Sequence, residues 1–352
     1  MKKIQWIVVL FTVLTLVLAA CGGGATPTQV PATQAAATKA PMANDQGLCT
    51  PEAMSEENAT TLVIGTGGKG GVFYPFGEGL ANILSANMPG VTTTFIETGG
   101  SVDNMKFIQS GEAQIGFSTV DSAYDAIQGQ AAYAEVGKIP ACALAVLYTS
   151  FVHVIASEAS GIATVADMKG KIVSVGDSGS STEGAADRVL EAAGLYPKAD
   201  ITRQNLSIAD ATAAMSAGTI DAFFWIGGLP TKAVKDMLST GTKANFIDAS
   251  EFVAPMSAKY GPVYRAFTLS KDVYGTEADV PGIGIGNILF VNANMSEEQA
   301  HQILTVIFAH LDEVHALHAQ ASSFTLQDAV VGSSIPFHPG AIKFYAEQGV
   351  WK

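Results

Sequence analysis

The sequence is short of positive charge. It has 19 lysines and arginines against 32 aspartates and glutamates, which gives a formal net charge of −13 over 352 residues. A chain this acidic is a poor partner for nucleic acids and for anionic membrane surfaces, so we expect neither as a binding partner. A small anionic ligand is not excluded, because the donors that surround a site decide its local charge.

Cysteine and histidine are also scarce. His310, His315 and His318 share an expected helical segment over residues 297–319, but no third ligand follows at zinc spacing, so we expect no metal. Of the three cysteines, Cys21 stands directly after the apolar N-terminal segment. In an oxidising exterior, the remaining Cys49 and Cys142 either form a disulfide or stay as two buried thiols.

Long apolar runs at the N-terminus are limited to Trp6 to Leu18, and about 20 apolar residues are normally needed to cross a bilayer. Lys2 and Lys3 precede this run, and Leu18-Ala19-Ala20-Cys21 follows it in the manner of a lipobox. We interpret residues 1–20 as a lipoprotein signal peptide and Cys21 as the lipidated mature N-terminus. The mature chain, with a charge of −15, would then be extracytoplasmic and anchored to the membrane by lipid.

Residues 21–60 contain little that a core could bury. The segment is rich in Gly, Ala, Thr, Pro and Gln, so it predicts a flexible tether between the lipid and the folded part. About 290 residues remain, which is enough for two lobes with their own cores.

The folded part repeats a pattern. Strands are expected at 61–65, 91–97 and 113–118, with helices at 75–87, 102–110 and 121–129, an alternation typical of an α/β sheet. The strand and Gly-rich turn at Ile64-Gly65 recur 111 residues later at Val175-Gly176. "FIQSGEAQIGF" (107–117) recurs 107 residues later as "AMSAGTIDAFF" (214–224), with a helix that ends at Gly111 or Gly218. These offsets indicate two lobes of similar topology.

Two such lobes would turn the carboxyl ends of their strands toward a shared cleft, where ligands of open α/β sheets bind. Small-residue turns fall there: Gly67 to Gly71, "ETGGS" (97–101), "GSSTE" (179–183) and "WIGGLP" (225–230). Backbone N–H groups and hydroxyls at helix starts can hold a carboxylate. The pattern therefore predicts a clamp for a small anion.

Four segments in this order carry a resemblance to a known family: "LVIGTGGKGGVFYPFGEGLANIL", "ETGGSVDNMKFIQSGEAQIGFSTVDSAYDAI", "GDSGSSTE" with "DAFFWIGGLP", and "IPFHPGAIKFYAEQGV". Over about residues 61–351 the chain resembles TAXI-type solute receptors of TRAP transporters. The resemblance implies a two-lobed α/β fold of the periplasmic-binding-protein type II kind. Its function would be to bind glutamate or a related acidic amino acid or 2-oxoacid, as a monomer without a cofactor, and to deliver it to an ion-gradient-driven permease.

Lobe I would comprise residues 61–148 and 286–352, and lobe II residues 149–285. By position, the resemblance implies these solute contacts: Gly67, Gly68, Tyr74, Thr98, Gly100, Ser101, Thr119, Ser180, Ser181, Thr182, Trp225 and Gly228. Three positions depart from the family pattern, namely Gly68-Lys69, Thr119-Val120 and Ser181. They bear on the identity of the solute more than on the mechanism.

Other interpretations of the same residues stay open. Lys69 either pairs with a solute carboxylate or faces solvent, and Tyr74 and Trp225 are either cleft walls or core side chains. Gly65, Gly67 and Gly70 satisfy a dinucleotide-binding pattern, but that explains only one of the two copies, and Gly70 stands where a P-loop needs Ser or Thr. "GDSGS" (176–180) lacks the last glycine of a nucleophile elbow. A sensory receptor for the same solute, or a cleft enzyme, are the alternative functions.

Overall fold

In a computed structural model of the protein, residues 49–351 are described. The signal at Cys21 and the tether up to residue 48 lie outside them. The strands are β1 (Thr61–Gly65), β2 (Thr92–Ile96), β3 (Ile115–Thr119), β4 (Ala141–Ser157), β5 (Ile172–Ser174), β6 (Thr202–Gln204), β7 (Ala222–Gly227), β8 (Ala244–Phe246), β9 (Tyr264–Leu269) and β10 (Val280–Asn292).

The helices begin and end close to the expected positions in the first half. They are α1 (Phe73–Asn87), α2 (Ser101–Ser110), α3 (Val120–Gln128), α4 (Ser181–Ala192), α5 (Ile208–Ser216), α6 (Lys232–Ser239), α7 (Val253–Tyr260), α8 (Lys271–Tyr274), α9 (Glu297–Ala309), α10 (Leu311–Leu317) and α11 (Pro339–Glu347). None of the helices within residues 49–351 has the length and apolar content that a membrane crossing needs.

The prediction of a single helix over residues 297–319 is wrong. α9 ends at Ala309, and His310 has φ −113° and ψ 31°, which is outside the helical region, before α10 begins. The three histidines of this segment consequently have separate surroundings. His310 pairs with Glu313, His315 contacts the carbonyl of Phe324, and His318 accepts a hydrogen bond from the Gln320 amide.

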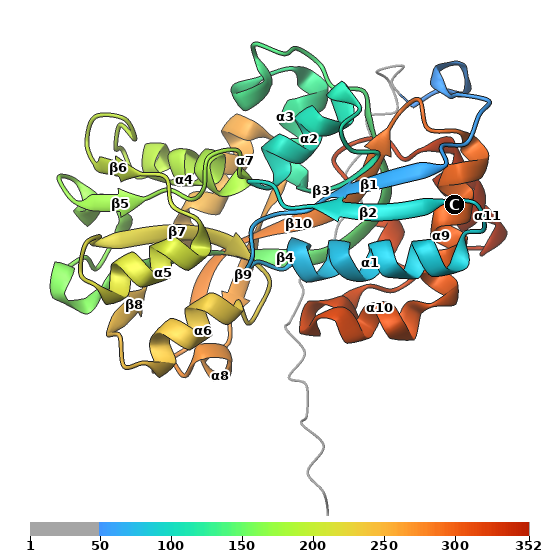
Figure 1. Cartoon of the computed structure of the whole chain (residues 1–352). Helices are drawn as coiled ribbons and strands as arrows, with labels where there is room; N and C mark the ends of the chain where they lie inside the picture. Colours follow the sequence, from blue (N-terminus) through green and yellow to red (C-terminus); the bar gives the residue numbers. More distant parts are fainter. Residues whose placement is uncertain (1–48, 352) are drawn as a thin grey trace, which may run out of the picture. The chain divides into compact units, whose positions relative to one another are not determined.

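The described strands form one 10-stranded mixed sheet in the order β2-β1-β3-β10-β4-β7-β5-β6, with β8 beside β4 and β9 beside β10. In each half, three parallel strands are followed by an antiparallel one: β2-β1-β3 then β10, and β6-β5-β7 then β4. Figure 1 shows β1, β2 and β3 on the right, β5, β6 and β7 on the left, and helices packed along both. The expected α/β fold with two similar lobes is confirmed.

The offsets read from the sequence agree with this topology. β5 starts 111 residues after β1, and β7 starts 107 residues after β3. Gly111 follows α2 with φ +83°, and Gly218 follows α5 with φ +70°, a backbone conformation that glycine adopts without a steric cost. The same local signal thus ends the corresponding helix in each half.

Two long strands connect the halves. The first part of β4 pairs with β10 and its second part pairs with β7, while β10 pairs with β9 at its start and with β3 at its end. The lobe boundaries predicted at 148–149 and 285–286 fall inside these strands and remain predictions. Gly282 and Gly284 of β10 leave room for neighbouring side chains: a Cβ at Gly282 would lie 2.7 Å from the Phe151 ring.

The end of the expected flexible tether is attached to the fold. Cys49 forms a disulfide with Cys142 of β4, with 5.9 Å between their Cα atoms. The Ala59 amide donates to Gln299 Oε1 at 3.1 Å, and Ser55 N donates to the Asn294 carbonyl at 2.8 Å. The expectation of a free linker up to residue 60 therefore does not hold for residues 49–60, because a covalent bond and hydrogen bonds fix them to the first half.

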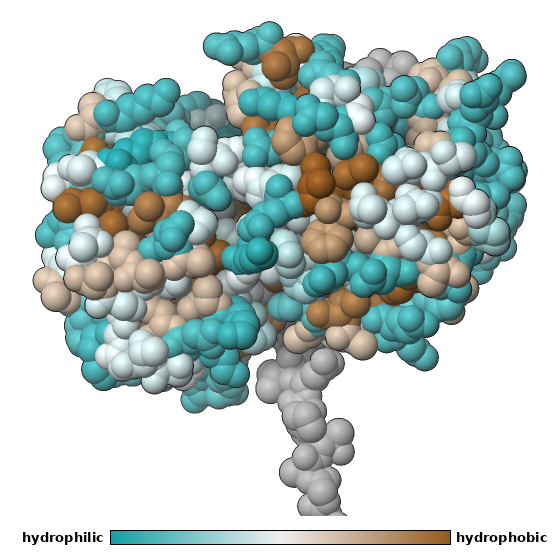
Figure 2. Space-filling view, in the orientation of Figure 1, coloured by the Kyte–Doolittle hydropathy of each residue, from teal (hydrophilic) through white to brown (hydrophobic). Residues whose placement is uncertain are grey.

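The apolar residues are mostly inside. β4 is buried along almost its whole length, as expected for a central strand covered on both faces. Among the described residues, the exposed large hydrophobic side chains are Val136, Ile172 and Tyr196. On the face drawn in Figure 2, apolar residues accordingly lie in small groups among polar ones.

Candidate functional site

A pocket lies where the carboxyl ends of the strands of both halves meet. Each contributing segment ends a strand, follows one, or belongs to one of the two long connecting strands. The lining residues are Gly67, Gly68, Gly71, Val72, Phe73, Gly99, Gly100, Ser101 and Thr119 from the first half, Asp177, Ser180, Ser181, Thr182, Ser207, Ile208, Trp225, Ile226 and Gly227 from the second, and Tyr148, Ser150 and Asn287 from β4 and β10. The pocket is thus built symmetrically from the corresponding turns.

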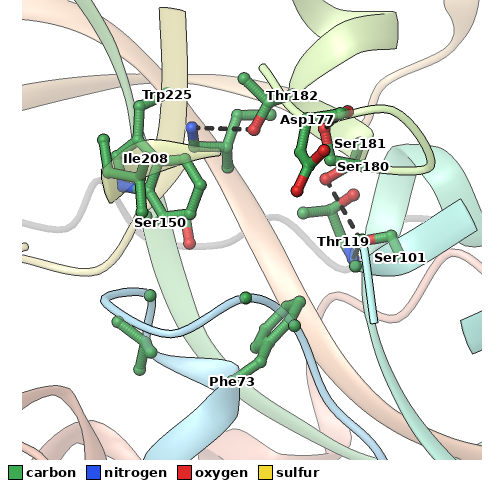
Figure 3. A pocket seen from close by; sticks show the side chains of 18 of the residues that line it. Phe73, Ser101, Thr119, Ser150, Asp177, Ser180, Ser181, Thr182, Ile208 and Trp225 are labelled. Carbon is green, nitrogen blue, oxygen red and sulfur yellow. Dashed lines mark hydrogen bonds between the residues drawn. The ribbon is translucent and has the colours of Figure 1, made fainter. Parts of the chain in front are cut away.

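The space in the pocket suits a small solute. Its cavity volume is about 50 Å³, several times the roughly 10–15 Å³ that one water molecule needs. Figure 3 shows Phe73 on one side of it, Trp225 and Ile208 on another, and Ser101 with Thr119 opposite these. The walls are therefore aromatic and aliphatic, with a small number of polar groups between them, a usual composition for small-molecule sites.

The structure brings to this pocket nine of the twelve contacts that the resemblance implies, and it does not bring Lys69, the thirteenth candidate. The nine are Gly67, Gly68, Gly100, Ser101, Thr119, Ser180, Ser181, Thr182 and Trp225. Trp225 faces the Gly67–Gly71 turn, since a Cβ at Gly71 would lie 3.3 Å from its ring. Its indole N–H donates to Thr231 Oγ1 at 3.0 Å, so the ring offers the solute an apolar face.

Lys69 and Tyr74 lie outside the pocket lining. The Lys69 ammonium lies 3.6 Å from Glu97 Oε2 and 5.7 Å from the centre of the Tyr74 ring, and the Lys69 side chain is 70% exposed. The Tyr74 ring packs edge-on against Phe95, with 5.5 Å between ring centres. Glu97 offers the lysine a partner in the loop itself, so the structure favours the solvent-facing interpretation of Lys69.

Thr98 and Gly228 lie outside the lining as well. Thr98 Oγ1 donates to Asn104 Oδ1 at 2.8 Å and accepts from the Gly100 amide at 3.1 Å, so it holds the turn before α2. A Cβ at Gly228 would lie 2.5 Å from Gln320, which shows that this glycine lets a neighbouring side chain approach. Both positions support the loops that surround the pocket.

Sequence reasoning missed the polar residues of the connecting strands and one carboxylate. Tyr148 and Ser150 belong to the long, mainly apolar run of residues 141–156, which carries no binding motif, and Asp177 stands in the "GDSGS" segment, which resembles only part of a nucleophile elbow. Asn287 is the single amide in the run "VPGIGIGNILF", and a buried strand rarely carries an amide without a partner. That isolated asparagine is the signal that could have pointed to the site.

Two side chains of the lining have a fully buried polar atom with no hydrogen-bond partner. They are Thr119, whose Oγ1 is unpartnered in a residue 1% exposed, and Asn287, whose Oδ1 is unpartnered in a residue 0% exposed. Leaving such an atom unpaired costs about 1–3 kcal/mol. A cost of this size at two positions of one pocket suggests that a ligand satisfies both.

Backbone amides at the two helix starts have different surroundings. At α4, the Ser180 hydroxyl accepts from the Glu183 amide, while the amides of Ser181 and Thr182 lie in the first turn, where no helical carbonyl can accept from them. At α2, the amides of Val102 and Asp103 donate to the carbonyl of Gly179 in the other half, at 3.1 and 3.2 Å. The start of α4 is therefore the stronger candidate for holding a solute carboxylate.

The charge of the lining comes from one residue. Asp177 is its only ionisable carboxylate, and no lysine, arginine or histidine is among the lining residues given by the described part of the chain. Burial raises the pKa of Asp177, and the nearby carboxylate of Asp103 raises it further. Figure 3 shows the Asp177 carboxylate directed toward the open space.

The halves touch each other beside the pocket. Ser101 Oγ donates to Ser181 Oγ at 3.2 Å, and it also accepts from the Thr119 amide at 3.1 Å. Farther out, Arg188 of α4 is 7% exposed and pairs with Asp125 of α3, while its Nη1 donates to Tyr264 at 2.6 Å and lies 3.8 Å from Asp121. These contacts join α3 and α2 to α4, so the structure shows the two halves closed.

A family model described as "NMT1-like family" matches residues 64–349 of this chain. Among solved structures, the chain is similar to the periplasmic aliphatic sulphonate binding protein SsuA from Escherichia coli, with 18% identity, a TM-score of 0.46, and coverage of 84% of this chain and 80% of that one. The alkanesulfonate-binding protein SsuA from Xanthomonas axonopodis pv. citri, bound to MOPS, has 18% identity, a TM-score of 0.42, and coverage of 84% and 81%. The substrate binding protein of an amino acid ABC transporter has 14% identity, a TM-score of 0.42, and coverage of 74% and 98%.

Proposed function

The chain belongs to the NMT1-like family, and we propose that it is an extracytoplasmic solute-binding receptor of a transport system. The observation that carries the proposal is the pair of buried, unpartnered atoms, Thr119 Oγ1 and Asn287 Oδ1, in a pocket formed by both halves. The two residues lie opposite each other on β3 and β10. A solute that pairs with these atoms and also reaches the start of α4 in the other half stabilises the closed form by its differential affinity for it. Closing around a solute and opening again binds and releases it, so this function requires no covalent chemistry from any residue.

The solute in this proposal is small and carries a carboxylate, as in glutamate, a related acidic amino acid or a 2-oxoacid. The amides of Ser181 and Thr182 at the start of α4, with the hydroxyl of Ser181, supply donors for that carboxylate. The delivery partner is a TRAP-type membrane permease, in keeping with the resemblance to TAXI receptors. Lipid on Cys21 would keep the receptor at the membrane.

Thr119 offers a test that separates binding from folding. In the substitution Thr119→Val, the shape is kept and the unpartnered hydroxyl is removed. We expect the solute-free protein to be as stable as wild type or slightly more stable, because the unpaired atom is gone. We also expect solute affinity to fall about 10- to 100-fold, the typical effect of losing one hydrogen bond to a charged group.

The measurement is a thermal-shift titration of the full chain, unfolded and refolded to remove any carried solute, with glutamate, aspartate, 2-oxoglutarate and other small acids. A ligand at 100 times its Kd adds about 2.7 kcal/mol to stability. Thr94→Val is the matched control, since Thr94 is an exposed residue of β2. The receptor proposal would be contradicted if no acid shifts the melting temperature, or if an added acid is turned over. A sensory role would be distinguished from transport by the membrane protein that the receptor binds: a signalling protein for the former and a permease for the latter.

A further inference from the structure

Two side chains of the pocket lining present oxygens that can only accept from a solute, Asn287 Oδ1 and the Asp177 carboxylate, although an anion needs donors. Asn287 Nδ2 donates to the Tyr148 carbonyl at 3.0 Å and to Ser150 Oγ at 2.9 Å. A carbonyl can only accept, so this bond fixes which end of the amide is nitrogen and which is oxygen. The atom left without a partner, Oδ1, is consequently an acceptor that waits for a donor.

Asp177 is a second acceptor in the same pocket. Its backbone carbonyl caps the turn by accepting from Ser180 N at 3.2 Å and from the Ser180 hydroxyl at 2.6 Å, which fixes the residue next to the start of α4. Its side chain lines the pocket and points into it. No hydrogen bond or ion pair to another side chain is seen for this carboxylate within residues 49–351, whereas Asp187 on the following helix pairs with Arg203.

The charges around the pocket also favour a solute that carries a positive group. Lys69 lies outside it beside Glu97, and Arg203 is held by Glu183 and Asp187. A solute with negative charge alone would meet the Asp177 carboxylate without a compensating cation from the lining residues. Asp177 is partly buried, and a solute that covers its carboxylate would remove the remaining water from it. A charge that loses its water is tolerated when it is paired, so the positive partner has to come with the solute.

We propose that Asp177 and Asn287 Oδ1 form a recognition site for a protonated amine on the solute. The inference rests on the proposed function and narrows its substrate class. The solute carries an ammonium group beside its carboxylate, as an amino acid does, and 2-oxoacids and simple dicarboxylates are poor ligands. The carboxylate binds at the start of α4, and the ammonium lies between the Asp177 carboxylate and the Asn287 carbonyl oxygen.

The test compares acids that differ only in the amine. Isothermal titration of the refolded full chain uses three pairs: glutamate with glutarate, alanine with propionate, and leucine with 4-methylpentanoate. We expect the amine-bearing member of the pair that fits the pocket to bind at least 10-fold more tightly. The variant Asp177→Asn should reduce this preference to within about threefold, and Asp177→Glu should retain most of it. Asp312→Asn, on the exposed surface of α10, is the matched control and should change nothing.

The outcomes separate the two proposals. If an acid and its amine-bearing partner bind wild type equally, amine recognition is overturned and the receptor stands. An unchanged preference in Asp177→Asn, with its folding confirmed by its melting temperature, also overturns it. If that variant does not fold, the wild-type ratios decide. If no acid or amino acid binds, the receptor proposal fails and this inference fails with it.

Discussion

The two halves of the sheet have the same strand order and differ in the chemistry of their turns. In the first half, the turn after β1 is formed mainly by glycines, and the N-cap residue of α1, Val72, provides no side-chain cap. In the second half, the corresponding turn carries Asp177 and Ser180, and the Ser180 hydroxyl caps α4. The repeated topology thus places two similar edges at one pocket, and the residues at those edges decide what each contributes.

This difference suggests a division of roles. The first half supplies close backbone approach and one unpartnered hydroxyl, on Thr119, while the second supplies the charge, the capped helix start and the Trp225 wall. Recognition of the charged groups of the solute would then depend mainly on the second half, whereas Thr119 and Asn287 on β3 and β10 would supply further hydrogen bonds. Closure would depend on contacts between the halves. Variants that affect one half, both, or only their junction can distinguish these roles.

The largest effect is expected at the junction, for Arg188→Met. Arg188 is buried between the halves, where it pairs with Asp125 and stacks on Tyr260 at 4.3 Å from the ring centre. Its removal leaves the carboxylates of Asp121 and Asp125 buried without their cation, a type of change that costs about 3–5 kcal/mol. Solute affinity should fall as well, because the closed form loses a contact that the open form lacks.

Denaturant unfolding and solute titration measure the two parts of this prediction. Arg203→Met is the control within one half. Arg203 of β6 pairs with Glu183 and Asp187, which both belong to α4, and its side chain is more exposed than that of Arg188. We expect it to cost about 1 kcal/mol. Equal losses for the two variants would show that the junction has no special part in stability. Partial recovery in Arg188→Met with Asp125→Asn would identify the unpaired carboxylate as the cause.

A smaller loss of stability, of similar size in each half, is expected when the pH is lowered. His153 in the second half and His338 in the first are fully buried, and burial lowers the pKa of each to about 4. The unfolded chain takes up these protons near pH 6.5, so stability is fully present above that pH and is lost as the pH falls toward 4. By pH 5 each histidine should account for about 2 kcal/mol of lost stability.

Chemical denaturation at pH 7.5 and pH 5 of wild type, His153→Gln and His338→Asn checks this. Asn at position 338 can still cap α11, where the His338 ring accepts from the Gly340 amide at 3.2 Å. Each variant should lose less stability than wild type over the same interval, by about 2 kcal/mol. A variant that keeps the wild-type loss would show that its histidine is already protonated, or exposed, in the folded protein.

The sequence predicted the scaffold better than the site. Strand and helix patterns, the two offsets and the terminal glycines all depend on local residue order, and they located the first elements within about two residues. The site depends on residues brought together from the turns after β1, β2, β5 and β6, from the ends of β3 and β7, and from two long strands. Ser181 and Thr119 could be predicted because they stand at a recognisable helix start and strand end. Tyr148 and Asn287 lie on long strands, and their place in the pocket depends on the pairing of β4 with β10, which local sequence does not specify; the isolated Asn287 only marks a polar position in an apolar strand.

The predicted contacts that lie outside the pocket lining have a common feature. Tyr74 and Thr98 were implied by position in the family resemblance, and Lys69 was left open between the solute and solvent. In each case a neighbour supplied another partner: Glu97 for Lys69, Phe95 for Tyr74 and Asn104 for Thr98. Position in a turn limits where a backbone runs, but the partner of a side chain depends on residues from other strands.

The smallest effect is expected for Lys69→Ala, in the first half. Its ion pair with Glu97 is exposed and screened by salt, and the lysine lies outside the pocket lining. We therefore expect less than a twofold change in solute Kd at moderate salt. Ser181→Ala provides the comparison in the second half, because Ser181 lines the pocket and contacts Ser101; its Kd should rise about 10-fold. A tenfold rise for Lys69→Ala instead would mean that the lysine leaves Glu97 for the solute, and that the first half also takes part in reading its charge.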